Sequence, residues 1–127
     1  MANVSLIHLK KQFRQSVAVS DFSLEIADGE LVSFLGPSGC GKTTTLRMIA
    51  GFIDPTAGRI LIGGVDVTAL PVHQRNTGMV FQRYALFPHM TVAQNVSFGL
   101  EMRKLPAHER DRRIDLALDM VRMTEYK

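Results

Sequence analysis

Apolar and polar positions follow two different periods along this chain. Up to residue 81 the chain consists of short runs in which apolar residues either alternate with polar ones or follow one another. Glycine, proline and aspartate residues separate these runs. This pattern is typical of strands joined by turns. One of them, the apolar run 31–35 (LVSFL), predicts a short buried strand. Together the runs predict strands over residues 4–10, 23–26, 31–35, 59–62, 65–67 and 77–81.

Helical spacing appears first at residues 44–50, where Gly51 is a natural C-terminal end for the helix. It returns after Thr91 and Gln94, which fit a capping box. The helix that follows carries one apolar face, made of Val92, Val96 and Leu100. A last helix has Pro106 in its first turn and a stripe made of Ile114, Ala117, Leu118 and Val121. Strands, then a βα unit, then helices predict an α/β domain with a small antiparallel subsheet.

Candidate chemistry is concentrated between the strand 31–35 and the helix 44–50. Residues 36–43 read G-P-S-G-C-G-K-T, the pattern G-x-x-x-x-G-K-[ST] in the strand-to-helix context of a phosphate-binding loop. The glycines let main-chain N–H groups turn around a phosphate, and the helix directs its positive end at the same anion. The candidate nucleotide-binding residues are Gly36, Pro37, Ser38, Gly39, Cys40, Gly41, Lys42, Thr43 and Thr44.

Two side chains of this loop have distinct predicted roles. Lys42 supplies a mobile charge for the β- and γ-phosphates, and the Thr43 hydroxyl can ligate the Mg²⁺ that accompanies them. The chain is therefore predicted to bind a nucleoside triphosphate. Cys40 is the only cysteine, and we interpret it as a small residue at a variable loop position.

Composition narrows the class of protein. With 127 residues, 46% of them hydrophobic and 21% charged, the chain has the size and make-up of one globular domain. A net charge of +3 without basic-aromatic clusters argues against nucleic acid as a partner. No apolar stretch approaches the roughly 18–20 residues of a membrane span, and the N-terminus lacks the pattern of a secretion signal. A single cysteine suits a reducing cytosol.

Gln82 follows the predicted strand 77–81, where ligands gather in α/β sheets. Its amide oxygen can reach a metal ion or an attacking water, or it is simply a polar strand end in water. The loop after it carries Tyr84, Leu86, Phe87 and Met90, more apolar residues than a solvated connection needs. We favour a docking surface for another protein over inward packing of all four.

Phe13 lies in a predicted loop that can fold over the phosphate site. Its ring either stacks on a nucleotide base or fills the core, and the sequence leaves both open. The four histidines have no metal-ligand spacing, so we assign none of them to a metal or to acid–base chemistry.

Taken together, these motifs resemble the nucleotide-binding domain of ATP-binding cassette (ABC) transporters, over essentially the whole chain. The loop 36–43 resembles the Walker A motif, and Gln82 in V-F-Q-R-Y-A-L-F-P-H-M-T-V resembles the Q-loop. Phe13 falls where the family has an adenine-stacking aromatic, usually tyrosine or tryptophan, and Val19 falls near a position that packs on the nucleotide. The segment L-F-P-H-M-T-V-A-Q-N-V-S-F-G-L is most similar to importer ATPases of the polyamine, ferric-iron, sulfate and sugar group.

The resemblance implies a P-loop ATPase that binds ATP and Mg²⁺. Lys42 and Gln82 would be catalytic, with Thr43 and Gln82 as metal ligands. Implied partners are a second ATPase subunit, transmembrane permease subunits that bind the loop after Gln82, and indirectly a solute-binding protein. The implied location is the cytoplasmic face of the plasma (inner) membrane, as a peripheral subunit.

Three family features have no match here: the L-S-G-G-Q signature, the apolar Walker B strand ending in Asp-Glu, and the switch histidine. We therefore expect residues 1–127 to be the N-terminal portion of an ABC ATPase domain, truncated before those segments. Without them the chain alone is expected to be poorly stable and hydrolytically inactive.

Two other functions compete with an importer ATPase. One is a non-catalytic fragment that binds only nucleotide or permease. The other is a small P-loop kinase, which needs arginines that converge on an acceptor pocket. The late arginines fall instead mainly on a charged helix face; they are Arg103, Arg110, Arg112 and Arg113. An ABC ATPase of DNA repair or translation is disfavoured by the importer-like segment after Gln82.

Overall fold

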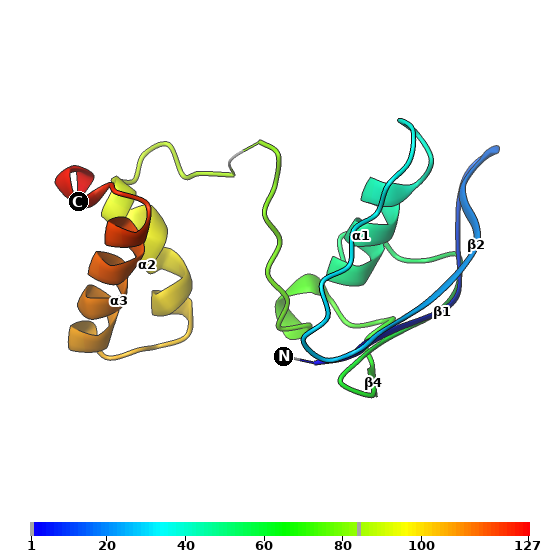
Figure 1. The fold of residues 1–127 in the computed structure, drawn as a ribbon, viewed down its shortest axis with the longest axis horizontal. Coiled ribbons are helices and arrows are strands. Elements are labelled where there is room, and N and C mark those ends of the chain that lie inside the picture. The colour runs from blue at the N-terminus through cyan, green and yellow to red at the C-terminus, as the bar shows by residue number, and fades with distance from the viewer. Residues whose placement is uncertain (1, 84) are drawn as a thin grey trace. The chain divides into compact units, whose positions relative to one another are not determined.

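The computed structural model describes residues 2–83 and 85–127, which form two compact units, Met1–Met79 (unit 1) and Val80–Lys127 (unit 2). Unit 1 contains a four-stranded sheet in the order β2-β1-β3-β4, with every neighbouring pair antiparallel (Figure 1). The strands are β1 (Val4–Phe13), β2 (Ser16–Ile26), β3 (Ala57–Ile62) and β4 (Val65–Asp66). This confirms the predicted antiparallel subsheet, although β1 and β2 are longer than the sequence pattern indicated.

Strands β1 and β2 form a hairpin whose two-residue turn is Arg14-Gln15. Arg14 adopts a positive φ of 48°, which a tight hairpin turn requires. The pairing shifts three times along the hairpin. In the last shift Lys11 pairs with Val19 while Gln12 pairs with Val17, which leaves Ala18 as an extra residue on β2. Such a bulge bends the strand and re-aims its peptide groups.

The core of unit 1 lies between this sheet and α1 (Lys42–Ala50), which packs over one face (Figure 1). Gly51 ends α1 in the left-handed conformation at φ 85°, as predicted. A short 3-10 turn, η1 (Val72–Gln74), follows β4. The buried residues of the main cluster are Leu6, Leu9, Val19, Met48, Ile60 and Val67.

Two predicted strands are wrong. Residues 31–35 and 77–81 carry no strand hydrogen bonds to any described residue. Leu31 and Leu35 are 93% and 92% exposed, and Val80 is 100% exposed. A continuous apolar run predicts a strand only when neighbouring strands pair with it and cover it. No strand of the described chain does so here.

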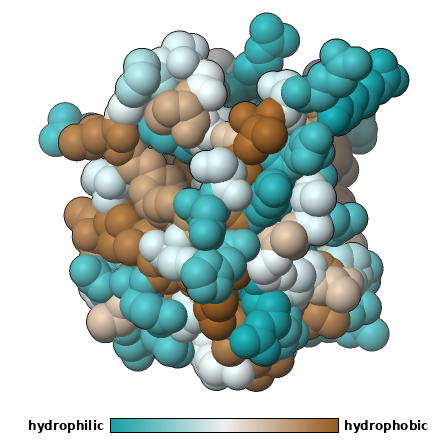
Figure 2. Space-filling model, turned by 90° about the vertical axis from the view of Figure 1, so that its right-hand side faces the viewer, coloured by the Kyte–Doolittle hydropathy of each residue, from teal (hydrophilic) through white to brown (hydrophobic). Residues whose placement is uncertain are grey.

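Other large apolar side chains of unit 1 are also partly exposed, among them Val17, Leu46 and Val65. Seen from the side of the β1–β2 hairpin, apolar areas alternate with polar ones on the surface (Figure 2). Scattered exposure of this kind is ordinary for a protein surface.

Unit 2 is a helical hairpin of α2 (Val92–Met102) and α3 (Ala107–Met120), followed by the 3-10 turn η2 (Thr124–Tyr126). The predicted capping box is confirmed, because Thr91 accepts from the Gln94 N–H and the Gln94 side chain accepts from the Thr91 N–H. Ile114 and Leu118 are buried as the apolar stripe predicted, whereas Val121 lies just beyond the end of α3 and is exposed. None of the described helices is both long enough and apolar enough to span a bilayer.

On the exposed face of α3, Glu109 receives hydrogen bonds from Arg112 (2.9 Å) and Arg113 (2.7 Å). These bonds lower the pKa of Glu109 from 4.5 to about 2, and the bond from Arg112 has the larger effect. A lowered carboxylate pKa contributes stability that is present above pH 4.5 and is lost as the pH falls toward about 2.

We therefore expect Glu109→Gln to flatten the acid dependence of unfolding between about pH 4.5 and pH 2. The effect will be small because the pair is exposed, and salt will reduce it further. Thermal unfolding followed by circular dichroism over this window measures it, with Glu125→Gln in η2 as the control for loss of one carboxylate. Identical acid profiles for Glu109→Gln and the unaltered chain would contradict the assignment.

Candidate functional site

The glycine-rich segment immediately before α1 packs against the hairpin. Gly41 has φ 95°, and a Cβ at this position would lie 2.5 Å from the Ala18 carbonyl oxygen and 3.2 Å from the Val19 side chain. A Cβ at Gly36 would lie 2.9 Å from Cys40 Sγ. Gly41 is thus required by close approach to a main-chain atom as well as by backbone conformation, whereas the contact at Gly36 is with a side chain that can rotate. The bulge at Ala18 turns the carbonyl of β2 toward this loop.

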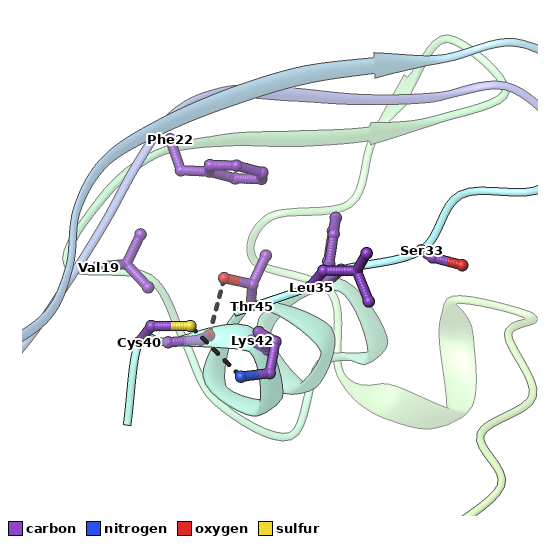
Figure 3. A pocket seen from close by; sticks show the side chains of 9 residues that line it. Val19, Phe22, Ser33, Leu35, Cys40, Lys42 and Thr45 are labelled. Carbon is purple, nitrogen blue, oxygen red and sulfur yellow. Dashed lines mark hydrogen bonds between the residues drawn. The ribbon is translucent and has the colours of Figure 1, made fainter. Parts of the chain in front are cut away.

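Lys42 lies across the loop (Figure 3). Its ammonium group donates hydrogen bonds to the carbonyls of Gly36 and Pro37, both at 2.7 Å, and lies 3.4 Å from Cys40 Sγ. All three contacts are with uncharged groups of the loop itself. The positive charge is therefore held at the loop without a carboxylate neutralising it there.

The first turn of α1 is prepared for an anion. Its N-cap is Gly41, which has no side chain to cap the helix, and the first turn contains no acidic residue. The first helical hydrogen bond is donated by the Thr45 N–H to Gly41 at 2.8 Å. The N–H groups of Lys42, Thr43 and Thr44 have no acceptor within the helix. Glycine cradle, ammonium and open helix end together fit a polyphosphate.

A pocket of about 310 Å³ lies beside this loop, between β2 and α1 (Figure 3). The loop side contributes polar groups from Cys40, Gly41, Lys42 and Thr45. The opposite wall is apolar, and includes Val19 and the edge-to-face pair Phe22–Phe34, whose ring centroids are 5.8 Å apart. Val19 thus lies next to the phosphate loop, and its contact with a nucleotide stays a prediction.

Phe13 lies at the tip of the β1–β2 hairpin and is 45% exposed. The alternative that the Phe13 ring fills the core is therefore excluded. Lys11 Nζ lies 5.0 Å from the centroid of the Phe13 ring. An exposed ring with a cation beside it is available for stacking on a flat ligand.

Gln82 is exposed and belongs to unit 2, whereas the phosphate loop belongs to unit 1. It does not end a strand, because residues 77–81 are not part of the sheet. Its contact with a phosphate or metal ion stays a prediction, as does the metal-binding role of Thr43, whose side chain is exposed in the first turn of α1.

The apolar loop after Gln82 is divided by the structure. Phe87 packs on Phe98 of α2, with ring centroids 4.6 Å apart, and its main chain is held by the Asn95 side chain at 2.9 and 3.2 Å. Leu86 is 66% exposed. Tyr84 lies outside the described residues. Phe87 thus packs on α2 while it remains 37% exposed, and Leu86 is the more exposed of the two.

Sequence reasoning missed Arg75, the most deeply buried charge among the described residues at 3% exposure. Its guanidinium donates to four main-chain carbonyls, those of Met48, Ile49, Thr68 and Leu70, at 2.7–3.0 Å. Burial lowers the pKa of Arg75 from its ordinary value, and the charge of Asp54 opposes this. Arg75 therefore ties the C-terminal end of α1 to the segment after β4. The sequence offered little indication of this role, because a single arginine in a polar loop belongs to no motif or periodic pattern that would predict its burial.

Comparison with known proteins agrees with this geometry. The sequence profile of the family described as ABC transporter matches residues 19–127. The spermidine/putrescine import ATP-binding protein PotA of Acidothermus cellulolyticus is 60% identical over 105 residues, which are 83% of this chain and 27% of the relative. The Fe(3+) ions import ATP-binding protein FbpC of Rhizobium etli is 52% identical over 118 residues, 93% of this chain and 33% of the relative.

A solved dimeric structure of the ATP-binding cassette MJ0796, in a post-hydrolysis state bound to ADP and Pi, matches with a TM-score of 0.81. The match is 31% identical and covers 92% of this chain and 56% of that chain. Our chain spans about a third or less of the length of the two curated relatives above. The predicted fold, an ABC-type P-loop ATPase domain with an N-terminal antiparallel β-subdomain, is confirmed. The chain belongs to the ABC transporter family.

Proposed function

We propose that this chain is the nucleotide-binding portion of the ATPase subunit of an ABC importer, in which ATP binding and hydrolysis drive solute uptake through a membrane permease. The observation that supports it most directly is the phosphate loop. Lys42 donates hydrogen bonds to two loop carbonyls at 2.7 Å, and α1 begins at Lys42 after an N-cap, Gly41, that has no side chain to cap it. Its relatives named above are import ATP-binding proteins, which supports the importer class.

In this proposal the loop residues bind the triphosphate of ATP. The main-chain N–H groups from Gly39 to Thr44 surround the β-phosphate, and the Lys42 ammonium moves from the loop carbonyls to the β- and γ-phosphate oxygens. Val19 packs beside the sugar and Phe13 stacks on the adenine. The Thr43 hydroxyl would supply an oxygen ligand to Mg²⁺, and the ion would neutralise charge on the β- and γ-phosphates. The Gln82 amide oxygen, in unit 2, stays the second predicted ligand.

The proposed partners follow from the second unit. A permease subunit would bind the segment after Gln82, with Leu86 as its exposed apolar contact. A second ATPase subunit would complete the dimer, and the permease would receive cargo from a solute-binding protein. The proposed location is the cytoplasmic face of the plasma (inner) membrane.

The kinase alternative is disfavoured by the ion pairs of unit 2. Arg112 and Arg113 are both bound to Glu109, and Arg110 lies 3.6 Å from Glu101. Arginines engaged along a helical surface in this way are not arranged around an acceptor pocket. The remaining alternative is a non-catalytic fragment that binds only nucleotide or only a permease.

Titration calorimetry of the purified chain with ATP and with AMP, each with Mg²⁺, tests the proposal. We expect saturable ATP binding and at least roughly tenfold weaker AMP binding, because the loop contacts phosphates that AMP lacks. Equal affinities, or no binding of ATP, would overturn it. Phosphate release in the same samples tests the separate expectation that residues 1–127 alone do not hydrolyse ATP.

A further inference from the structure

A lysine near the tip of the β1–β2 hairpin contacts two groups from different parts of unit 1. Lys11 Nζ donates to the main-chain carbonyl of Asp54 at 2.6 Å and lies 5.0 Å from the centroid of the Phe13 ring. Lys11 and Phe13 are two residues apart on β1, as residues that share a strand face are. Neither contact is an ion pair: the ammonium donates a hydrogen bond to a main-chain carbonyl and makes a cation–π contact with the ring.

The hairpin tip is also fixed through its main chain. The Gln12 N–H donates to Thr56 Oγ1 at 3.1 Å, and the Thr56 N–H donates to the Lys10 carbonyl at 2.7 Å. With the Lys11–Asp54 bond, these contacts join the end of β1 to the turn that follows α1. The Phe13 side chain, in contrast, is 45% exposed, and in the described chain Lys11 is the group that lies over its ring.

Strand pairing places this arrangement beside the phosphate loop. Lys11 pairs with Val19, which lines the pocket together with Gly41 and Lys42. Phe13 pairs with Ser16, two residues before Ala18, whose carbonyl faces Gly41. At about 3.3 Å per strand residue, the end of β1 lies roughly 7 Å along the strand from that contact. In the proposed function a nucleotide with its phosphates in the loop extends its base toward Phe13.

We infer that Lys11 is a positioning residue for the nucleotide base, acting through Phe13; this rests on the proposed function of the phosphate loop. Lys11 holds the Phe13 ring in one orientation by a cation–π contact, and its bond to Asp54 fixes the ammonium. A ring that is already oriented loses less side-chain entropy when a base stacks on it. Lys11 thus strengthens binding of the base while leaving binding of the phosphates unchanged.

The test compares ATP with inorganic tripolyphosphate, by titration calorimetry of the whole chain. The ratio of ATP affinity to tripolyphosphate affinity measures how much the base and ribose contribute to binding. In the unaltered chain stacking makes this ratio roughly five- to hundredfold. We expect Lys11→Met, which keeps the aliphatic stem, to reduce the ratio at least threefold without changing tripolyphosphate affinity. Lys11→Arg keeps a cation and a donor, and should restore the ratio. Lys10→Met, an exposed neighbour on β1, is the matched control.

Three further results decide the inference. Lys11→Gln keeps a donor without the charge, so a reduced ratio in this variant also supports the cation–π contact if Lys11→Met fails to fold. A Phe13→Ala background should abolish the effect of Lys11→Met, as coupled residues require. An unchanged ratio in both Lys11→Met and Lys11→Gln overturns the inference, and so does an equal loss of ATP and tripolyphosphate affinity. If the unaltered chain binds neither, the proposed function itself fails; if it binds both equally, only the role of Phe13 and Lys11 fails.

Discussion

Lys42→Ala is expected to weaken ATP binding about ten- to hundredfold while leaving the fold intact. A hydrogen bond to a charged group contributes about 1.5–3 kcal/mol, and each 1.4 kcal/mol is tenfold in affinity. In the described structure the ammonium of Lys42 is bound only to groups of its own loop, the carbonyls of Gly36 and Pro37 and Cys40 Sγ. Those loop residues are exposed, so water can replace the lost bonds and stability should change by less than about 1 kcal/mol.

Calorimetric titration with Mg-ATP measures the change in affinity, and circular dichroism shows whether the variant is folded. Lys10→Ala is the matched control, because Lys10 is an exposed lysine in the same unit and its loss changes the net charge equally. ATP affinity should stay within about twofold in that control. A folded Lys42→Ala chain that binds ATP as tightly as the unaltered chain would remove the role assigned to Lys42.

Arg75→Met is expected to lower the free energy of unfolding by about 3 kcal/mol or more. The substitution removes the donor to four carbonyls, of which that of Met48 still accepts from the Gly51 N–H, and each buried group left unpaired costs about 1–3 kcal/mol. Removing the desolvated charge of Arg75 offsets part of this cost. The offset is limited because the Ile49 carbonyl stays at the covered end of α1, where a methionine side chain cannot donate a hydrogen bond to it.

Urea denaturation followed by circular dichroism checks this expectation. Arg47→Met serves as the control, because Arg47 is an exposed arginine of the same helix and its loss should cost less than about 1 kcal/mol. Arg75→Lys should give an intermediate loss, since one ammonium cannot reach both α1 and the segment after β4. Equal midpoints for Arg75→Met and Arg47→Met would show that water already serves these carbonyls.

The elements that local chemistry specifies were predicted well. The end of α1 at Gly51 and the capping box of Thr91 and Gln94 depend on residues within a few positions of each other. The phosphate loop is similar, because its glycines, Lys42 and the following helix form one short segment. Each of these local features could be predicted from the sequence because its interacting groups are close together along the chain.

The predictions that failed depend on distant partners. Residues 31–35 and 77–81 have strand-like composition, but a strand forms only beside another strand, and none of the described chain pairs with either segment. Arg75 was overlooked for the same reason, since its acceptors on α1 are 26 and 27 residues away. Phe13 and Phe87 could each have been core or surface until packing placed one at a hairpin tip and the other against Phe98.

The family of the chain was thus identified from the sequence alone, because the glycine-rich loop at 36–43 and the segment around Gln82 are each short runs of consecutive residues. Tertiary structure decided which apolar residues are covered, that Ala18 forms a bulge facing Gly41, and that Lys11 reaches both Asp54 and Phe13. Those outcomes depend on strand register and on contacts between segments far apart in the chain, and neither is encoded in a local pattern.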